Sequence, residues 1–145
     1  MCYKVKDIAN KLLVMSSEAG ELMTNLKLQK MLYYQQGFHL AYFNTPLFED
    51  EIEAWMYGPV VPSVYDNYSS YGSNGIEGDS TSVITLSESQ EESLFAEVFR
   101  VYSKFSALGL MDMTHQEMPW KSTPVGKGHV IEKDKMKSFF KERLK

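Results

Sequence analysis

One segment constrains the fold more than any other, because it is apolar on nearly every face. Residues 25–42 read NLKLQKMLYYQQGFHLAY, and after Lys30 apolar side chains occupy almost every helical position. A helix that is hydrophobic all round is buried on all sides, so other elements must pack around it. The segment therefore predicts a mainly α fold, a single compact helical domain built round a central helix at 25–42.

The start and the middle of this central helix carry specific signals. Thr24 or Asn25 can cap it, because both side chains accept hydrogen bonds from the free N–H groups of a first turn. Gly37 costs about 1 kcal/mol relative to alanine inside a helix, so we expect a packing reason for it, such as close approach of another backbone. Buried polar side chains need partners, and we expect those on this helix to fasten neighbouring loops. They are Gln29, Gln35, Gln36 and His39.

Helices are also predicted before and after the central one. Residues 5–20 place apolar side chains three and four positions apart, and Gly20 stops or breaks that helix. Residues 87–90 (SESQ) have the capping-box pattern, and apolar residues follow at helical spacing as far as Phe105. Gly109 is a predicted stop, although a second short helix could begin near Leu108.

Prolines and one acid mark three further helix boundaries. Pro62 suits the first turn of a short helix, whereas Pro119 is expected to keep Met118 out of the helical conformation. Asp134 can cap a last helix, in which Phe139 and its neighbours face inward.

A small sheet is predicted from two short segments. Residues 52–57 alternate in the manner of a strand, and Gly58 and Pro59 are expected to end it in a turn. Residues 69–82 are rich in glycine and serine and predict a mobile loop. Residues 83–86 predict a second strand, so we expect a two-stranded β-hairpin between 52–57 and 83–86.

Length and composition favour one globular domain over residues 1–145. Of the 145 residues, 43% are hydrophobic and 23% are charged, which argues against disorder as the main state. The one cysteine, Cys2, cannot form an internal disulfide, which excludes a disulfide-stapled secreted scaffold. No apolar run approaches the ~18 residues of a membrane helix, and the first residues are amphipathic, unlike a signal peptide. We therefore expect a cytoplasmic protein with no membrane contact.

The net charge of −4 is distributed unevenly along the chain. Residues 41–100 contain eleven acidic side chains and one basic side chain, Arg100, whereas both flanking segments are net positive. An acidic middle argues against a continuous phosphate-binding surface, so we expect no direct nucleic-acid binding. Aromatic residues make up 13% of the chain, and there are nine methionines. Such side chains fill cores, and Tyr, Trp and Met also favour partner-binding surfaces.

The residues that carry enzyme or metal chemistry do not form a recognisable set. The three histidines are far apart in sequence, and none has the spacing of a zinc site. His115, with Asp112 and Glu117 close by, is the one local cluster of titratable groups. Neither a nucleophile elbow nor a complete phosphate loop is present. We expect no metal, no cofactor and no enzymatic activity.

Three segments, in this order and spacing, resemble the Panacea domain, also called the SocA-like or phage-associated protein family. They are residues 24–41 (TNLKLQKMLYYQQGFHLA), 46–65 (PLFEDEIEAWMYGPVVPSVY) and 114–120 (THQEMPW). The resemblance implies an antitoxin that neutralises a toxin in a bacterial or prophage toxin–antitoxin pair, with the toxin usually encoded by the adjacent gene. One branch of the family delivers its bound toxin to a Clp-type protease. Some members add a DNA-binding module, for which we expect no room here.

From these segments we predict a partner-binding surface. Inactivating a toxin requires surface area and no catalysis, and Tyr and Trp commonly anchor such interfaces. Two alternatives stay open, a proteolytic adaptor and an enzyme of unknown reaction that uses His115 and nearby carboxylates. Several of the chosen side chains also have a structural interpretation, as core or as loop anchors. The predicted contact residues are Asn25, Lys27, Gln29, Lys30, Tyr33, Tyr34, Trp55, Tyr57, His115, Gln116 and Trp120.

Overall fold

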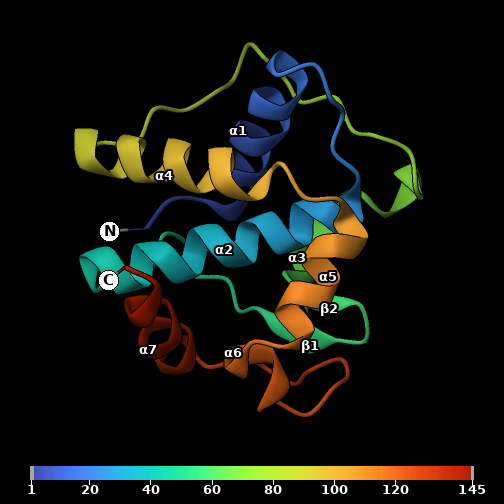
Figure 1. The fold of residues 1–145 in the computed structure, drawn as a ribbon. Coiled ribbons are helices and arrows are strands. Elements are labelled where there is room, and N and C mark those ends of the chain that lie inside the picture. Colours follow the sequence, from blue (N-terminus) through green and yellow to red (C-terminus); the bar gives the residue numbers. More distant parts are fainter. Residues whose placement is uncertain (1, 145) are drawn as a thin grey trace.

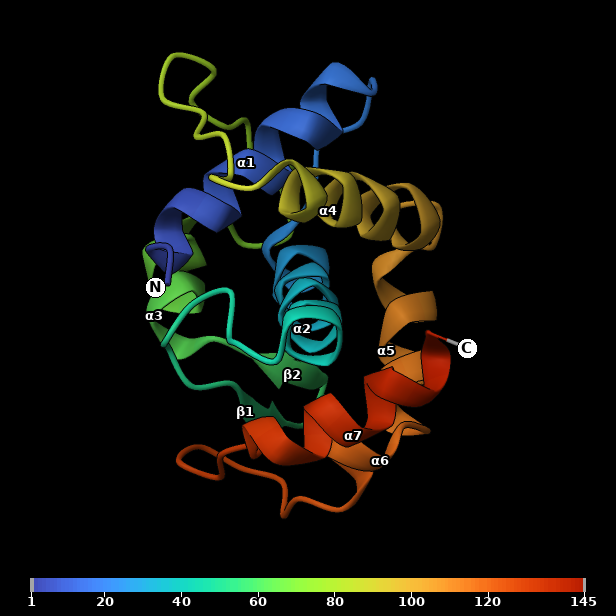
Figure 2. The same ribbon diagram turned by 90° about the vertical axis from the view of Figure 1, so that its left-hand side faces the viewer.

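The predicted central helix lies in the middle of the computed structural model, which describes residues 2–144. It is α2, Asn25–Phe43, and the Thr24 side chain caps it by accepting a hydrogen bond from the Lys27 N–H at 3.2 Å. Apart from Leu26 and the last two residues of the helix, every position of α2 is buried. Figure 2 looks along this helix and shows the other elements arranged around it.

Helices surround α2 on most sides, which confirms the mainly α fold. In Figure 1, α1 (Val5–Glu18) and α4 (Ser89–Tyr102) lie above α2, and α7 (Lys133–Arg143) lies below it. The buried apolar side chains of all these elements form one continuous core cluster. The remaining helical segments are α3 (Pro62–Asn67), a 3₁₀ turn (Ser69–Tyr71), α5 (Ala107–His115) and α6 (Met118–Lys121).

A two-stranded antiparallel hairpin is present, but its second strand is not the predicted one. Strand β1 (Glu53–Trp55) pairs with β2 (Gly58–Val60), and the turn between them is Met56–Tyr57. The prediction that Gly58 and Pro59 end the strand in a turn was therefore wrong, because both belong to β2. The predicted strand at 83–86 is also wrong, since these residues have no strand structure.

The edges of the hairpin explain why residues 83–86 do not join it. On the outer side of β1, the Ala54 N–H donates to the His129 carbonyl at 2.9 Å and the Ala54 carbonyl accepts from Gly126 at 2.8 Å. Residues 83–86 run past α1 and α4 instead. There, the Lys11 ammonium donates to the Ile84 carbonyl at 2.7 Å, and Leu86 is buried.

Gly37 has the packing reason that its place in a helix requires. A Cβ atom at this position would overlap the ring of Phe140, which belongs to α7. The group that approaches Gly37 is therefore a side chain, and not the backbone that the sequence suggested. Because Phe140 is fully buried, Gly37 lets α7 pack directly on α2.

The buried polar side chains of α2 hold neighbouring segments, as expected. The Gln36 amide accepts from the Leu47 N–H at 2.7 Å and donates to the Phe48 carbonyl at 2.8 Å. Gln35 donates to the Phe95 carbonyl of α4 at 3.0 Å. His39 bonds through one ring nitrogen to the Thr45 carbonyl and through the other to Glu91 of α4.

Several predicted helix boundaries are displaced by short-range effects. The first turn of α4 is capped one residue later than predicted, by Glu88, whose N–H donates to Glu91 at 3.3 Å. Gly109 is not a stop but lies in the first turn of α5, where its N–H donates to the Ser106 hydroxyl at 3.0 Å.

The starts of α6 and α7 also differ from the predicted ones. Helix α6 begins at Met118, because a proline in the first turn lacks only an N–H that would be free there. The N-cap position of α7 is occupied by Glu132, whose side chain makes no cap hydrogen bond, and Asp134 lies within the first turn of the helix. None of the helices in residues 2–144 combines the length and apolarity needed to cross a bilayer.

Candidate functional site

The tip of the hairpin presents large apolar side chains to solvent. Met56 and Tyr57 form the turn, and their exposed fractions are 67% and 60%. Trp55 is the last residue of β1 and is partly buried, with its ring edge-on to Tyr65 of α3 at 5.2 Å between centroids. Exposed aromatic and methionine side chains of this kind are enriched at protein interfaces.

The hairpin is held against the core immediately behind its turn, where Gly58 pairs with Trp55. Gly58 has a φ of +117°, a backbone conformation that residues other than glycine rarely adopt. It also lies so close to α2 and α5 that a Cβ there would be 3.2 Å from Lys30 Cε and 3.1 Å from Thr114 Oγ1. After β2, the Val61 N–H donates to the Gln29 amide oxygen at 2.9 Å. The tip is therefore presented in one orientation.

Trp120 and His115 lie beside the hairpin. The Trp120 indole N–H donates to the Trp55 carbonyl at 2.9 Å, and the His115 ring stacks on Trp120 with centroids 4.0 Å apart. Within the described residues, His115 Nε2 is buried without a hydrogen-bond partner. Gln116 is exposed, and the Lys127 ammonium lies 5.5 Å from the centre of the Trp55 ring. Two of the predicted segments therefore meet here.

A pocket of about 210 Å³ opens behind the tip, between the hairpin and the start of α2. We call it the hairpin pocket. Its walls are mainly aromatic and aliphatic, and the two polar side chains from α2 are already bonded within the protein. Asn25 donates to the Tyr65 carbonyl at 3.1 Å, and Gln29 donates to Asn25 at 2.9 Å. The lining residues are Asn25, Leu26, Gln29, Trp55, Tyr57, Val60, Tyr65, Ser69 and Gly72.

Six of the predicted contact residues are buried in α2. Lys27 donates to the Ser103 carbonyl at 2.7 Å, and Asn25 and Gln29 make the bonds just described. Lys30 is fully buried, and its ammonium donates to the Leu26 carbonyl at 3.2 Å. Burial lowers the pKa of Lys30 to about 8. These side chains hold the fold in this structure, and Tyr33 and Tyr34 do the same.

Tyr33 and Tyr34 lie in a buried cluster around Glu117. Each tyrosine hydroxyl donates to one of the two Glu117 carboxylate oxygens at 2.9 Å, and Glu117 is 3% exposed. Burial raises the pKa of Glu117 and of both tyrosines. Arg143 of α7 approaches the carboxylate at 3.8 Å. The sequence placed Glu117 beside His115 and gave no signal that it would join two residues of α2.

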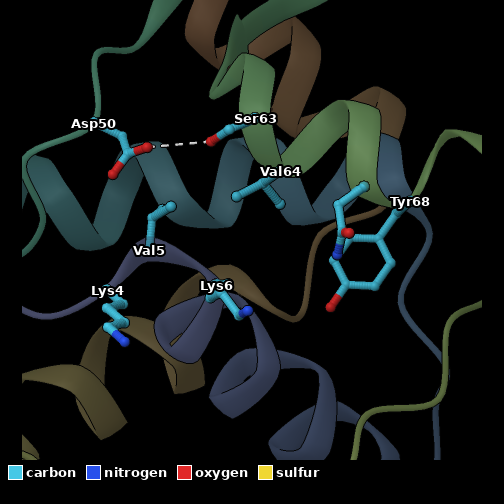
Figure 3. Close-up of a pocket in the computed structure, with 8 residues that line it drawn as sticks. Lys4, Val5, Lys6, Asp50, Ser63, Val64 and Tyr68 are labelled. Carbon is cyan, nitrogen blue, oxygen red and sulfur yellow. Dashed lines mark hydrogen bonds between the residues drawn. The ribbon is translucent and has the colours of Figure 1, made fainter.

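A second pocket, of about 370 Å³, lies between the start of α1 and α3 (Figure 3). Its lining includes Lys4 and Lys6, and on another wall the Ser63 hydroxyl donates to Asp50 at 3.2 Å. No residue predicted to contact a partner lines this pocket. Among the described residues, no group of three or more His, Cys, Asp or Glu side chains is arranged to hold a metal ion.

Comparison with known proteins identifies the family. The family model "Antitoxin SocA-like, Panacea domain" matches residues 28–121 of the chain. The chain belongs to this Panacea-domain family. Antitoxin SocA of Caulobacter vibrioides (strain NA1000 / CB15N) is 40% identical over 65 residues, which cover 45% of this chain and 35% of that protein. The match thus spans about a third of the length of this relative. No solved structure matches the chain.

The Panacea-domain match confirms the family predicted from the three segments. It contains the hairpin, His115, Trp120 and the buried Glu117 cluster up to residue 121. It leaves out α1 and α7, and with α7 it leaves out Arg143. Six of the eleven predicted contact residues are buried in α2, and the other five lie at or near the surface of this Panacea domain. They are Trp55, Tyr57, His115, Gln116 and Trp120.

Proposed function

We propose that this Panacea-domain protein is an antitoxin that neutralises a toxin by direct protein–protein binding, and that the adjacent gene encodes the toxin. The observation that carries the proposal is the 40% identity to Antitoxin SocA within a family described as SocA-like antitoxins. Because that match covers a third of the relative, the partner and mechanism here are our inference.

The surface supports a binding role. A standard interface buries about 800 Å² on each partner and is anchored by a few large side chains. Met56 and Tyr57 supply exposed anchors at a fixed hairpin, and Met118 of α6 is 58% exposed. Binding of a toxin at such a surface would need no reacting group from this chain.

The enzyme alternative gains no support from the cluster that motivated it. Asp112 and Glu117 are the carboxylates close to His115 in the sequence. Both carboxylate oxygens of Glu117 accept hydrogen bonds, one from the Tyr33 hydroxyl and one from the Tyr34 hydroxyl. The His115 ring stacks on Trp120. His115→Ala separates the alternatives when toxin binding is measured beside protection. Loss of protection with unchanged thermal stability and unchanged toxin binding would favour catalysis, whereas loss of protection together with weaker toxin binding would assign His115 to the contact surface; we expect no loss of protection at unchanged binding.

Co-expression tests the proposed function. The adjacent reading frame is induced alone and together with this protein, and growth and complex formation by size-exclusion chromatography are measured. We expect toxicity alone, rescue on co-expression and a stable complex. A harmless neighbour, or a toxin that stays toxic, would refute the proposal. Toxin half-life with and without this protein separates binding from the adaptor alternative, because an adaptor shortens it.

A further inference from the structure

We propose that the ion pair between His39 and Glu91 is a pH-sensitive switch that holds the N-terminal segment and the start of α4 against the end of α2. The segments are held together while both ring nitrogens of His39 carry a proton, and they are released when the ring becomes neutral. In Figure 1 the start of the chain, the end of α2 and the start of α4 lie together at the left of the molecule. Such a switch does not depend on the antitoxin role.

Both ring nitrogens of His39 face oxygen atoms that accept hydrogen bonds. Nδ1 lies 2.6 Å from the Thr45 carbonyl oxygen, and Nε2 lies 2.7 Å from Glu91 Oε2. A carbonyl and an ionised carboxylate can only accept, so each ring nitrogen has to donate. A neutral imidazole has one N–H and one lone pair, and it can therefore make only one of these two bonds. The geometry requires the doubly protonated ring.

Glu91 is the ionised partner of this pair. Burial by itself raises the pKa of Glu91, but hydrogen bonds from His39, Tyr3 and a backbone N–H outweigh burial, and the pKa lies below its ordinary value. The other titratable groups around the pair are Tyr3 of the N-terminal segment and Glu92 of α4, whose own partner at 2.8 Å is Lys11 of α1. The side chains of His39 and Glu91 are 6% and 11% exposed, so salt screens the pair only weakly.

Glu91 connects the His39 ring to two other segments. Glu91 Oε1 accepts from the Tyr3 hydroxyl at 2.7 Å and from the N–H of Glu88, the N-cap of α4, at 3.3 Å. The Tyr3 hydroxyl in turn accepts from the Ser87 N–H at 2.8 Å. One carboxylate therefore joins the end of α2, the N-terminal segment and the cap of α4, and the imidazolium of His39 supplies the positive charge that faces it.

Loss of one proton from His39 breaks this arrangement. A neutral ring presents a lone pair either to the Thr45 carbonyl or to the Glu91 carboxylate, and that buried acceptor then loses its donor. In an unfolded chain a histidine ring exchanges this proton at about pH 6.5. The folded state binds more protons at this site, so the stabilisation is complete below about pH 6.5 and is lost at higher pH, as the folded ring deprotonates.

Nuclear magnetic resonance of the ¹⁵N-labelled full chain tests the protonation state directly. The two ring nitrogens of an imidazolium have similar ¹⁵N shifts, whereas those of a neutral ring are widely separated. At pH 7 we expect similar shifts for His39 and separated shifts for His129, an exposed histidine that serves as the control in the same sample. As the pH is raised, the amides of Ser87 and Glu88 should change with the same midpoint as the His39 ring.

Two variants disrupt the pair from its two sides. His39→Asn keeps a short side-chain donor beside the Thr45 carbonyl and removes the charge. In urea unfolding, its loss in the folding equilibrium constant should be roughly tenfold larger at pH 6 than at pH 9, the size of one charge-assisted hydrogen bond. Glu91→Gln keeps the shape of the partner and removes its charge, so the His39 ring should become neutral at a lower pH. His129→Asn is the matched control and should alter neither stability nor the amides of the α4 cap.

Two results would overturn the inference. A neutral His39 ring at pH 7 would do so, because a neutral ring cannot donate to both acceptors. Deprotonation of the ring without any change at Ser87 and Glu88 would also do so, because the three segments would then be held without the charge. If His39→Asn does not fold, the titration of the unmodified protein and of Glu91→Gln still decides between these outcomes.

Discussion

Lys30 provides the sharpest test of how this fold is held together. Its side chain is fully buried in α2, and it forms no ion pair within the described residues. The pKa of the ammonium falls from 10.5 to about 8 because burial disfavours the charged form. Lys30→Met keeps a long unbranched side chain and removes the charge, so we expect a more stable protein.

The size of the expected stabilisation follows from the pKa shift of Lys30. A shift of one unit corresponds to 1.36 kcal/mol, so the buried charge of Lys30 disfavours folding by about 3 kcal/mol at pH 7. Lys30→Met also loses the hydrogen bond to the Leu26 carbonyl, at roughly 1 kcal/mol. The expected net gain in the free energy of unfolding is about 2 kcal/mol.

The sign of the pH dependence is also fixed. Between about pH 8 and 10.5 the unfolded state binds more protons at Lys30 than the folded state, so the stability of the unmodified protein rises with pH. The advantage of Lys30→Met should therefore be full below pH 8 and shrink as the pH rises towards 10. Tyrosine ionisation affects both proteins and cancels in the difference.

Urea unfolding followed by circular dichroism, at pH 7 to 10, measures this difference. Lys27→Met is the matched control, because the Lys27 ammonium donates to the Ser103 carbonyl at 2.7 Å and its loss should destabilise the protein. A Lys30→Met protein that is less stable at pH 7, or whose advantage does not change with pH, would refute the reasoning.

Two further substitutions test the packing around α2. Gly37→Ala should destabilise the protein by roughly 1–3 kcal/mol despite the better helix propensity of alanine, because the new methyl group overlaps Phe140; Phe140→Leu should recover part of this loss in a double-mutant cycle measured by urea unfolding. Glu117→Gln removes a carboxyl whose pKa is raised by burial. The unmodified protein should lose stability relative to this variant as the pH rises above about 4.5, and a difference that stays constant from pH 4 to 7 would contradict the assignment.

The elements of this protein could largely be predicted from short-range patterns. A stretch that is apolar on every face can only be a central helix, and the glutamines on it had to bond neighbouring segments. The wrong predictions concern helix and strand boundaries, where neighbouring residues are equally suited to the same role. Glu88 and Ser87 could both cap α4, and Gly58 reads equally well as a turn or as a strand residue with positive φ.

The strand pairing could not be predicted, because β1 had two possible neighbours. Residues 83–86 have the composition of a strand, but the turn at Met56–Tyr57 brings β2 back at once, and residues 126–131 occupy the other edge. The segment that pairs with β1 is decided by the path of the chain in three dimensions. A pattern of neighbouring residues in the sequence does not contain this information.

The motif residues divide in the same way. The sequence by itself determined the family, the central helix and the set of aromatic and polar side chains from which a site could be built. Only the tertiary structure decided which of them face solvent: Tyr33 and Tyr34 turn inward to Glu117, whereas Tyr57 turns outward at the hairpin. The physical reason is that burial depends on contacts between segments far apart in the chain, here more than 80 residues between Tyr33 and Glu117.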